Sequence, residues 1–325
     1  MKKLLILALD GVMDSSLAVT LDTLRTAQGF FERSGRSGGG LEWSLVGSRR
    51  TICTAGGLRA TADLTIRDAL ASSATGAEWL LVPGLDMTSR RAIAYRLARK
   101  DALAAIDLLR EGRAAKRIAA SCSSVFLLAE AGLLGGRAAT TTWWLAQAFR
   151  ERYPDVLLDE TRMLVRDGAY LTGGSLFAQL DVALAVVTAT MSAEIAHLCS
   201  RYMLIDRRAS QARYMIPSHV RHVDAVVLAA ERWIDAHLAE PISVTGLASA
   251  LAVSPKTLSR RIVAATGLSP VRFLQRRRVL EAMHLIETST MTIEAVAEKV
   301  GYQDGTALRK IVKRELGTTP SALRG

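Results

Sequence analysis

Apolar runs alternate with amphipathic segments along the first two-thirds of the chain. Residues 3–9 are an almost uninterrupted apolar run, typical of a strand buried on both faces of a parallel sheet. Residues 17–27 follow with apolar positions at helical spacing. Further strands are expected at 43–46, 79–82 and 118–120, and helices at 89–110 and after residue 124 as far as 131. This repeated order predicts an α/β fold with a doubly wound, mostly parallel sheet.

The last third of the chain carries a helical pattern that occurs twice. Residues 247–262 recur as residues 296–312, with an offset of 49 before a turn and 50 after it. The matched pairs include Leu247 and Val296, Ala248 and Ala297, Leu251 and Val300, Leu258 and Leu308, and Ile262 and Val312. Each copy has the layout of a helix-turn-helix, in which Ser254 or Asp304 caps the second helix. We therefore expect an all-α domain with two helix-turn-helix units, rigidly joined by a helix that begins near Pro270.

The second helix of each copy leaves a polar and basic face outside its apolar stripe. In helix-turn-helix proteins the first residues of this helix reach base edges, and later Arg and Lys meet phosphates. The candidate DNA-binding residues are Ser254, Lys256, Thr257, Ser259, Arg260 and Arg261 in the first copy, and Thr306, Arg309, Lys310, Lys313 and Arg314 in the second. The alternative is a helical bundle with solvated basic faces.

Charge favours a polyanionic partner. The chain has 42 Lys and Arg against 31 Asp and Glu, a formal net charge of +11. Residues 221–325 hold +5 of this charge and the first 220 residues hold +6, so the last third is nearly twice as basic per residue. Its bases are clustered at 260–261, 276–278, 309–310 and 313–314. Clustered bases on helices indicate nucleic-acid binding better than net charge does.

Length and composition complete the outline. A chain of 325 residues suggests two domains, and the polar, Arg-rich stretch 199–222 suggests a linker. We therefore expect an α/β domain over 1–198 and a helical domain over 223–325. No apolar run reaches the roughly 20 residues that span a bilayer, three cysteines fit a reducing compartment, and no His or Cys spacing suits a metal. The expectation is a cytoplasmic, nucleoid-associated protein without a cofactor.

Cys122 lies where an α/β sheet can present a nucleophile. It stands between Ser121 and Ser123, after a predicted strand and before a predicted helix, which is the layout of a nucleophile elbow. The dipole of that helix would lower the pKa of the thiol. Taken alone, however, a cysteine is more often a buried small apolar residue.

The sequence around Cys122 resembles the PfpI-like, class I glutamine-amidotransferase-like superfamily. The resemblance covers about residues 3–195 and rests on the opening strand with Asp14, and on residues 82–84, 120–143, 152–156 and 171–175 with Asp181. It implies a flavodoxin-like, amidotransferase-like sheet. Catalytic members pair the cysteine with a histidine, but Thr142 stands in that place here, and a threonine is no general base near neutral pH. Ser124 also replaces an expected glycine.

This departure predicts a site that binds without turnover, so no catalytic residue is expected. The expected pocket for a small-molecule effector lies at the carboxyl edge of the strands and consists of Asp14, Gly84, Cys122, Ser123 and Thr142. In relatives, an acidic residue in the place of Asp14 contacts the cysteine. One alternative is a vestigial domain that serves only dimerisation. The other is a Cys-dependent hydrolase, amidase or glyoxalase-type enzyme that carries a DNA-binding module.

Residues 223–323 closely resemble the DNA-binding domain of the AraC/XylS family. The matching residues are Ser254, Pro255, Arg278 and Ala282, and the segments 267–270, 293–297, 300–302 and 317–321. Gly305 and Leu308 depart from the usual Pro and Phe. With the amidotransferase-like domain in front, the chain is similar to the GlxA-type group of transcriptional regulators. The resemblance implies a sequence-specific transcription regulator that binds a double-stranded promoter operator. It also implies a homodimer formed through the N-terminal domain, with RNA polymerase as a further partner.

Overall fold

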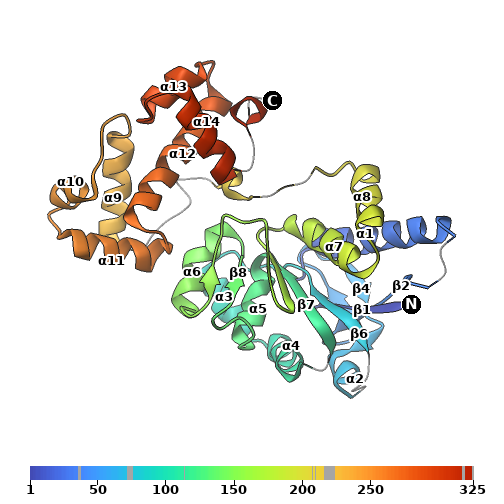
Figure 1. The fold of residues 1–325 in the computed structure, drawn as a ribbon. Helices are drawn as coiled ribbons and strands as arrows, with labels where there is room; N and C mark the ends of the chain where they lie inside the picture. The colour runs from blue at the N-terminus through green and yellow to red at the C-terminus, as the bar shows by residue number, and fades with distance from the viewer. Residues whose placement is uncertain are drawn as a thin grey trace. The chain divides into compact units, whose positions relative to one another are not determined.

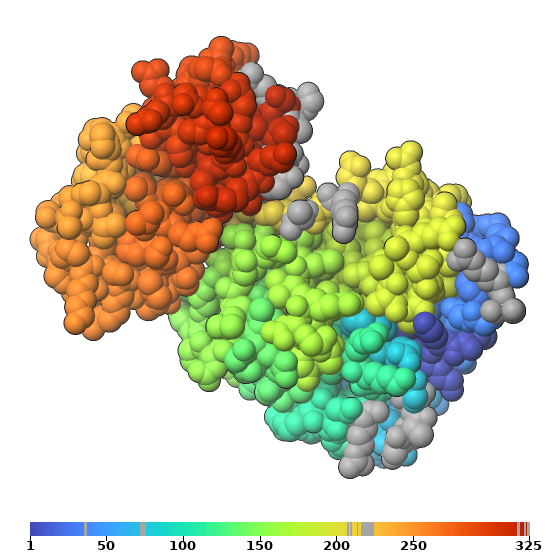
Figure 2. All heavy atoms as spheres, in the orientation of Figure 1, coloured from blue at the N-terminus to red at the C-terminus, as the bar shows by residue number. Residues whose placement is uncertain are grey.

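The chain divides into two compact units, which we call the α/β unit (Met1–Arg208) and the helical unit (Ala209–Gly325). In Figures 1 and 2 the helical unit is drawn mainly in orange and red. The computed structural model describes residues 1–35, 38–71, 76–112, 114–206, 208, 210–215, 224–316 and 319–323. Much of the expected linker 199–222, and Gly317 of the repeat, lie outside the described residues.

A seven-stranded sheet forms the centre of the α/β unit. Its order is β10-β11-β7-β6-β1-β2-β5, and all its pairs are parallel except β10 with β11. The strands are β1 (Lys2–Ala8), β2 (Leu41–Gly47), β5 (Leu64–Thr65), β6 (Ala77–Val82), β7 (Ala115–Ser121), β10 (Leu164–Asp167) and β11 (Tyr170–Gly173). Five neighbouring strands of the sheet, β2-β1-β6-β7-β11, have the flavodoxin-like order. The predicted α/β class is therefore confirmed.

Helices cover both faces of this sheet (Figure 1). One group consists of α1 (Asp14–Arg33), α7 (Ala178–Thr190) and α8 (Ala193–Tyr202), which pack against one another. The other group contains α2 (Ile66–Ala71), α3 (Arg90–Leu97), α4 (Lys100–Glu111) and α5 (Val125–Glu130). The remaining elements of this unit are β3 (Thr51–Cys53) and β4 (Arg59–Thr61), β8 (Ala138–Ala139) and β9 (Leu157–Leu158), α6 (Ala146–Arg152), and 3₁₀ turns at Cys122–Ser124 and Trp143–Leu145; a further 3₁₀ turn, Ala212–Tyr214, belongs to the helical unit.

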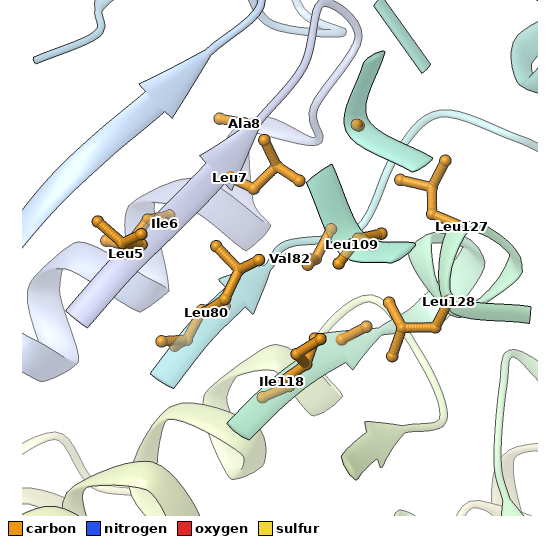
Figure 3. Close-up of a cluster of buried hydrophobic side chains, with 14 of the residues drawn as sticks. Leu5, Ile6, Leu7, Ala8, Leu80, Val82, Leu109, Ile118, Leu127 and Leu128 are labelled. Atoms are coloured by element: carbon orange, nitrogen blue, oxygen red, sulfur yellow. The ribbon is translucent and has the colours of Figure 1, made fainter. Parts of the chain in front are cut away.

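The core of the α/β unit lies between the sheet and its helices. Leu4 to Leu9 are at most 3% exposed, so β1 is buried on both faces, as its apolar run predicts. Figure 3 shows Leu7 of β1 and Leu80 of β6 gathered with Leu128 of α5. This packing holds the carboxyl ends of β1, β6 and β7 together, and the candidate site lies at that edge.

The predicted helix 89–110 is wrong in one respect, because the structure has two helices there, α3 and α4. Ser89 caps the first by accepting the Ala92 N–H at 3.2 Å, and Arg99 is extended between the two. The break turns Arg96 inward, where its guanidinium donates to Asp101 (2.9 Å) and to the carbonyl of Asp10 (2.6 Å). Helical spacing continues across the break, so the pattern alone conceals it.

The predicted end of the first domain at residue 198 lies inside α8, and the α/β unit extends to Arg208. Ile195 and Cys199 are buried on the inner face of α8, whereas its exposed face mixes polar residues such as Glu194 and Arg201 with apolar ones such as Leu198. Arg208 donates to the Phe177 carbonyl at 2.8 Å and pairs with Asp181 at the start of α7. These contacts hold the last residue of the unit against the α/β domain.

The helical unit contains the predicted duplicated helix-turn-helix. Its helices are α9 (Ala225–Ala236), α10 (Val244–Ala250), α11 (Pro255–Thr266), α12 (Pro270–Thr288), α13 (Ile293–Lys299), α14 (Gly305–Leu316) and α15 (Pro320–Leu323). We call α10–α11 the first repeat and α13–α14 the second repeat; α12 joins them. Ser254 caps α11 by accepting the Thr257 N–H at 3.1 Å, and Asp304 accepts the Ala307 N–H at 2.8 Å. Both expected caps are therefore present.

The turns of the two repeats share a backbone conformation that side chains rarely adopt. Ala252 has φ 53° and Gly301, its counterpart at the offset of 49, has φ 77°. Glycine takes this left-handed conformation without steric cost, whereas alanine is strained there. Within the described residues, no helix combines the length and apolar character needed to cross a membrane.

Candidate functional site

The chain makes a sharp, strained turn at Cys122, where β7 ends. Ser121 is the last residue of the strand, Cys122 has φ 55°, and a 3₁₀ turn at Cys122–Ser124 leads into α5. A left-handed conformation costs a residue other than glycine about 1–2 kcal/mol. The structure therefore contains the elbow geometry that the sequence suggests.

The expectation of a lowered thiol pKa is wrong. Cys122 is 6% exposed, and this burial raises the pKa of its thiol. The Ser123 N–H, the Ser123 hydroxyl and the Thr142 hydroxyl all favour the thiolate, but burial outweighs them. The following helix α5 has only six residues, so its dipole is small. The thiol is therefore protonated near neutral pH.

Hydroxyl groups fix the elbow against the loop that follows β6. Ser123 Oγ donates to the Leu85 carbonyl and Ser124 Oγ to the Pro83 carbonyl, both at 2.5 Å. The loop approaches the elbow closely at Gly84, where an added Cβ would lie 3.2 Å from Cys122 Cβ. Ser124, where a glycine is expected from the resemblance, thus has a structural hydrogen bond of its own.

Thr142 occupies the position of the absent histidine. It is fully buried, and its Oγ1 has no hydrogen bond of ordinary geometry among the described residues, although it lies near enough to the thiol to favour the thiolate. The neighbouring Thr141 donates from Oγ1 to the Cys122 carbonyl at 2.7 Å. Ser121 Oγ is likewise buried without a partner in the part of the chain that is described. Two buried hydroxyls with unmet hydrogen-bonding capacity therefore adjoin Cys122 along the chain or in space.

Asp14 is turned toward a hairpin, not paired with a base. Its carboxylate accepts a hydrogen bond from the Thr54 hydroxyl and another from the Gly56 N–H at 2.7 Å, between β3 and β4. These bonds lower the pKa of Asp14, that from Thr54 most. A Cβ at Gly56 would lie 2.8 Å from Asp14 Oδ2, so the loop closes tightly over the carboxylate. Of the expected pocket residues, the structure thus places Gly84, Ser123 and Thr142 beside Cys122, and gives Asp14 partners in the hairpin.

The described histidines lie on other elements than the elbow. His197 is exposed on α8, while His237 and His284 belong to the helical unit; His219 and His222 lie outside the described residues. Among the residues that the structure describes, no three His, Cys, Asp or Glu side chains are placed to hold a metal ion.

The basic side chains of α11 divide into free and engaged ones. Lys256 and Arg260 are exposed and have no ion pair within the described residues. Arg261 points back to α9, where its Nη1 lies 3.3 Å from both carboxylate oxygens of Asp224. Ser254 donates from Oγ to Thr257 Oγ1 at 2.9 Å in addition to capping the helix, and Ser259 is half-buried. The outward face of α11 is therefore carried mainly by Lys256 and Arg260.

The face of α14 shows the same division. Lys310 and Lys313 are exposed and lack an ion pair in the described part of the chain, and Thr306 is exposed in the first turn. Arg309 lies 2.8 Å from Glu294 of α13, and Arg314 lies 2.9 Å from its neighbour Glu315. Two lysines one turn apart thus remain free on the outer side of the second repeat.

The basic cluster 276–278 on α12 holds the helical unit together internally. Arg277 lies between α12 and α9, with its Nε 3.0 Å from Asp235 and its Nη1 3.6 Å from Glu231. Arg278 donates to backbone carbonyls, and Arg276 lies beside Met215. For this cluster the structure favours a role inside the unit, because acidic and carbonyl groups distant in the sequence surround two of its arginines.

Comparison with known proteins agrees with both units. Residues 2–189 match the sequence profile of the DJ-1/PfpI family, and residues 247–325 match that of a helix-turn-helix domain. The fold and its elbow thus define an α/β protein of the DJ-1/PfpI type with a helix-turn-helix module attached. The chain belongs to the DJ-1/PfpI family. The two resemblances found in the sequence, to a PfpI-like domain and to an AraC-type module, are confirmed.

Individual relatives resemble one unit each. The HTH-type transcriptional activator RhaS of Escherichia fergusonii is 34% identical over 92 residues, which is 28% of this chain and 33% of that protein. RhaS of Escherichia coli K12 is 29% identical over the same length. The chain therefore spans about a third of the length of these relatives.

Two solved structures share the fold of the α/β unit. Drosophila melanogaster DJ-1beta matches with a TM-score of 0.50 and 16% identity, over 63% of this chain and 99% of that one. An AraC family transcriptional regulator from Pseudomonas putida matches with a TM-score of 0.51 and 16% identity, over 62% of this chain and all of that one. At such low identity the likeness concerns the fold alone.

Proposed function

We propose that the protein is a sequence-specific DNA-binding transcription regulator whose helices α11 and α14 enter successive major grooves. One observation carries this proposal. Both helices expose basic side chains that have no ion pair within the described residues, and these stand beside arginines that are already paired. They are Lys256 and Arg260 on α11, and Lys310 and Lys313 on α14. Free cations on a duplicated helix-turn-helix suit two adjacent major grooves, which lie roughly 34 Å apart.

The expected contacts follow from the place of each residue along its helix. Lys256, Thr257 and Arg260 lie in the first half of α11, which is the half that reaches base edges, and Arg is suited to a bidentate bond with guanine. Thr306, Arg309 and Lys310 have the corresponding places on α14. Lys313 and Arg314 lie further along, where phosphate contacts are expected. Ser254 and Ser259 are expected to lie beside these contacts in the proposed interface. Arg261 is expected to hold α11 against the start of α9 through Asp224.

Two adjacent arginines provide the test. A DNA duplex is first selected from a random library with the whole chain, and affinity is then measured for Arg260→Ala and Arg261→Ala. We expect Arg260→Ala to weaken binding by about 1–3 kcal/mol, which is roughly 5- to 150-fold. Arg261→Ala removes the same charge from the same helix, but its side chain is engaged by Asp224, so it should change affinity much less. Failure to select any sequence, or equal losses in both variants, would contradict the proposal.

We further propose that the α/β unit binds a small-molecule effector near Cys122 and does not turn it over. Support comes from the buried hydroxyls of Thr142 and Ser121, which lack partners among the described residues, and from a thiol with a raised pKa and no imidazole at position 142. A panel of metabolites is to be titrated against the whole chain while thermal stability is followed. Absence of any stabilising compound, with the elbow filled by its own side chains, would contradict the proposal.

The rival enzyme is tested through the same cysteine. A Cys-dependent hydrolase, amidase or glyoxalase-type enzyme requires an activated thiol, through a general base beside it or through a lowered pKa. We expect amide and dicarbonyl substrates to react no faster with the wild-type chain than with Cys122→Ala. Turnover by the wild-type chain that disappears in Cys122→Ala would support the enzyme hypothesis instead.

The assembly and location that fit this role are also proposals. We propose a homodimer formed through the α/β unit, located in the cytoplasm with nucleoid DNA and able to contact RNA polymerase. Sedimentation of the whole chain tests the first of these, since a monomer at micromolar concentration would contradict it.

A further inference from the structure

Three segments of the helical unit converge on Gly301, in the turn of the second repeat. An added Cβ there would lie 2.2 Å from the backbone oxygen of Leu238 and 2.6 Å from Nη2 of Arg278. Leu238 belongs to the core of the first repeat, where it is buried with residues of α9, α10 and α11. The turn of the second repeat therefore packs directly on the backbone that follows α9, beside the core of the first repeat.

Arg278 of α12 bonds to both sides of this contact. Its Nη1 donates to the Gly301 carbonyl at 3.1 Å, and its Nη2 donates to the Glu240 carbonyl, just after Leu238, at 2.8 Å. The guanidinium also lies over the ring of Tyr302, 5.9 Å from its centroid. One side chain of α12 thus ties the segment between α9 and α10, which leads into the first repeat, to the turn of the second repeat.

Arg278 carries a desolvation cost that arginines exposed to water do not have. Arg278 has no carboxylate partner among the described residues, its Nε is buried without a hydrogen bond, and burial lowers its pKa. A half-buried cation held only by neutral groups contributes little net stability, whereas its hydrogen bonds constrain geometry. Arg277, its neighbour, has two carboxylates instead.

We propose that Arg278 is a positioning residue that sets the rotation of α14 relative to α11 about α12, and thereby the angular offset that the two DNA half-sites must have. Helix α12 alone fixes the distance between the repeats. A bond that lies off its axis, between the Glu240 and Gly301 carbonyls, is needed to fix their rotation about it. This proposal rests on the proposed DNA binding, and it concerns geometry, since Arg278 is turned to the interior of the unit.

The prediction concerns DNA spacing. Each base pair inserted between two half-sites moves one of them by about 3.4 Å and rotates it by about 35°. A rigid pair of recognition helices cannot follow this rotation. The wild-type chain should therefore lose roughly tenfold or more in affinity when one base pair is added to or removed from the spacer of its selected duplex.

The experiment compares two charge losses on the same helix. Arg278→Gln removes the guanidinium that bonds to the Glu240 and Gly301 carbonyls. Arg272→Gln removes an exposed charge that, among the described residues, forms an ion pair only with Glu315, at 3.6 Å. Affinity is measured for duplexes with spacers of −1, 0 and +1 base pair. We expect Arg278→Gln to discriminate among the spacers less than about threefold, and Arg272→Gln to behave like the wild type. The salt dependence of binding should be equal in all three, because Arg278 touches no phosphate.

Several results would overturn the inference. Unchanged spacer discrimination in Arg278→Gln would do so, and so would a salt slope that falls by about one, which would make Arg278 a phosphate contact. Circular dichroism shows whether the variant is folded; if it is not, Arg278→Lys, which keeps the charge but spans only one carbonyl, takes its place in the same series. A wild-type chain that selects no duplex would refute the proposed function itself, which is a separate outcome.

Discussion

Cys122 and Cys53 differ in exposure, and this difference predicts their reactivity. Cys53 is exposed, whereas burial raises the pKa of the Cys122 thiol and raises that of Cys199 to about 11. Since the thiolate is the nucleophile, iodoacetamide at neutral pH should modify Cys53 in the folded chain and leave the other two intact. Mass spectrometry of the peptides measures this, and all three should react in denaturant. Native Cys122 reacting as fast as Cys53 would contradict the burial argument.

Asp14 predicts a contribution to acid stability. Hydrogen bonds from Thr54 and Gly56 hold its pKa below the ordinary value of 3.8. A carboxyl with a lowered folded-state pKa adds stability that is complete above its unfolded-state pKa, near 4, and is lost as pH falls through the folded-state pKa. The difference in unfolding free energy between wild type and Asp14→Asn should therefore shrink as pH falls from about 6 to about 3. Urea unfolding across this range measures it, and a difference that does not vary with pH would count against the assignment.

Residue identity alone predicts the kind of site better than the role of each residue in it. Cys122 and Thr142 are recognisable in the sequence because the elbow and the missing base are local features of one motif. Arg260 and Arg261 are indistinguishable there, since the difference is made by Asp224, 37 positions earlier than Arg261. Side-chain roles that depend on a distant partner become visible only when the chain is folded.

At the scale of elements, a methyl group is expected to be unfavourable in both turns of the repeat, and more so at residue 301 than at residue 252. Ala252 is exposed and strained, so Ala252→Gly should stabilise the helical unit by about 0.5–1 kcal/mol. Gly301→Ala adds the same strain and a clash with the Leu238 oxygen, and should destabilise it by about 2–4 kcal/mol. Chemical unfolding measures both.

A third glycine separates strain from crowding in this comparison. Gly112 ends α4 with φ 64° and has no atom within 4 Å of an added Cβ, so Gly112→Ala should cost only about 1 kcal/mol. Equal losses in Gly112→Ala and Gly301→Ala would show that the contact at residue 301 is not tight.

Elements with a strong period and a local cap are predictable from the sequence, whereas breaks and boundaries are not. The apolar run of β1 and the capping residues Ser254 and Asp304 lie where the pattern puts them. The division between α3 and α4 escapes the pattern, because it depends on Arg96 reaching Asp10, 86 positions away. Local periodicity therefore predicts which elements exist, and tertiary contacts decide where they stop.

At the scale of the whole molecule, each unit has a hydrophobic core of its own, and this predicts two thermal transitions. Gly301→Ala should lower the transition of the helical unit alone. Gly173→Ala, whose Cβ would lie 2.8 Å from Val182 Cγ2, should lower that of the α/β unit alone. Differential scanning calorimetry of the whole chain distinguishes them; a single transition that both variants move together would contradict the prediction.

The order of the two units follows from the sequence, whereas their border does not. Alternating strands and helices, and then a repeat with offsets of 49 and 50, are patterns that extend over long stretches, from residue 3 to about 131 and from 247 to 320. The border depends on two contacts, the burial of Cys199 and the pairing of Arg208 with Asp181, in a stretch whose composition is that of a linker. Composition cannot show that such a stretch is attached to a folded surface.

That attachment has a consequence for how a signal would leave the α/β unit. Arg208 is held by Asp181 and by the Phe177 carbonyl, in the first turn of α7 and just before it. Leu176, the preceding residue, lies 3.8 Å from the Cβ position of Gly84, which itself adjoins Cys122. The residue at which the chain leaves the α/β unit is thus connected to the elbow through Phe177, Leu176 and Gly84. If the proposed effector moves the cysteine, these few contacts are the route by which the connector would respond.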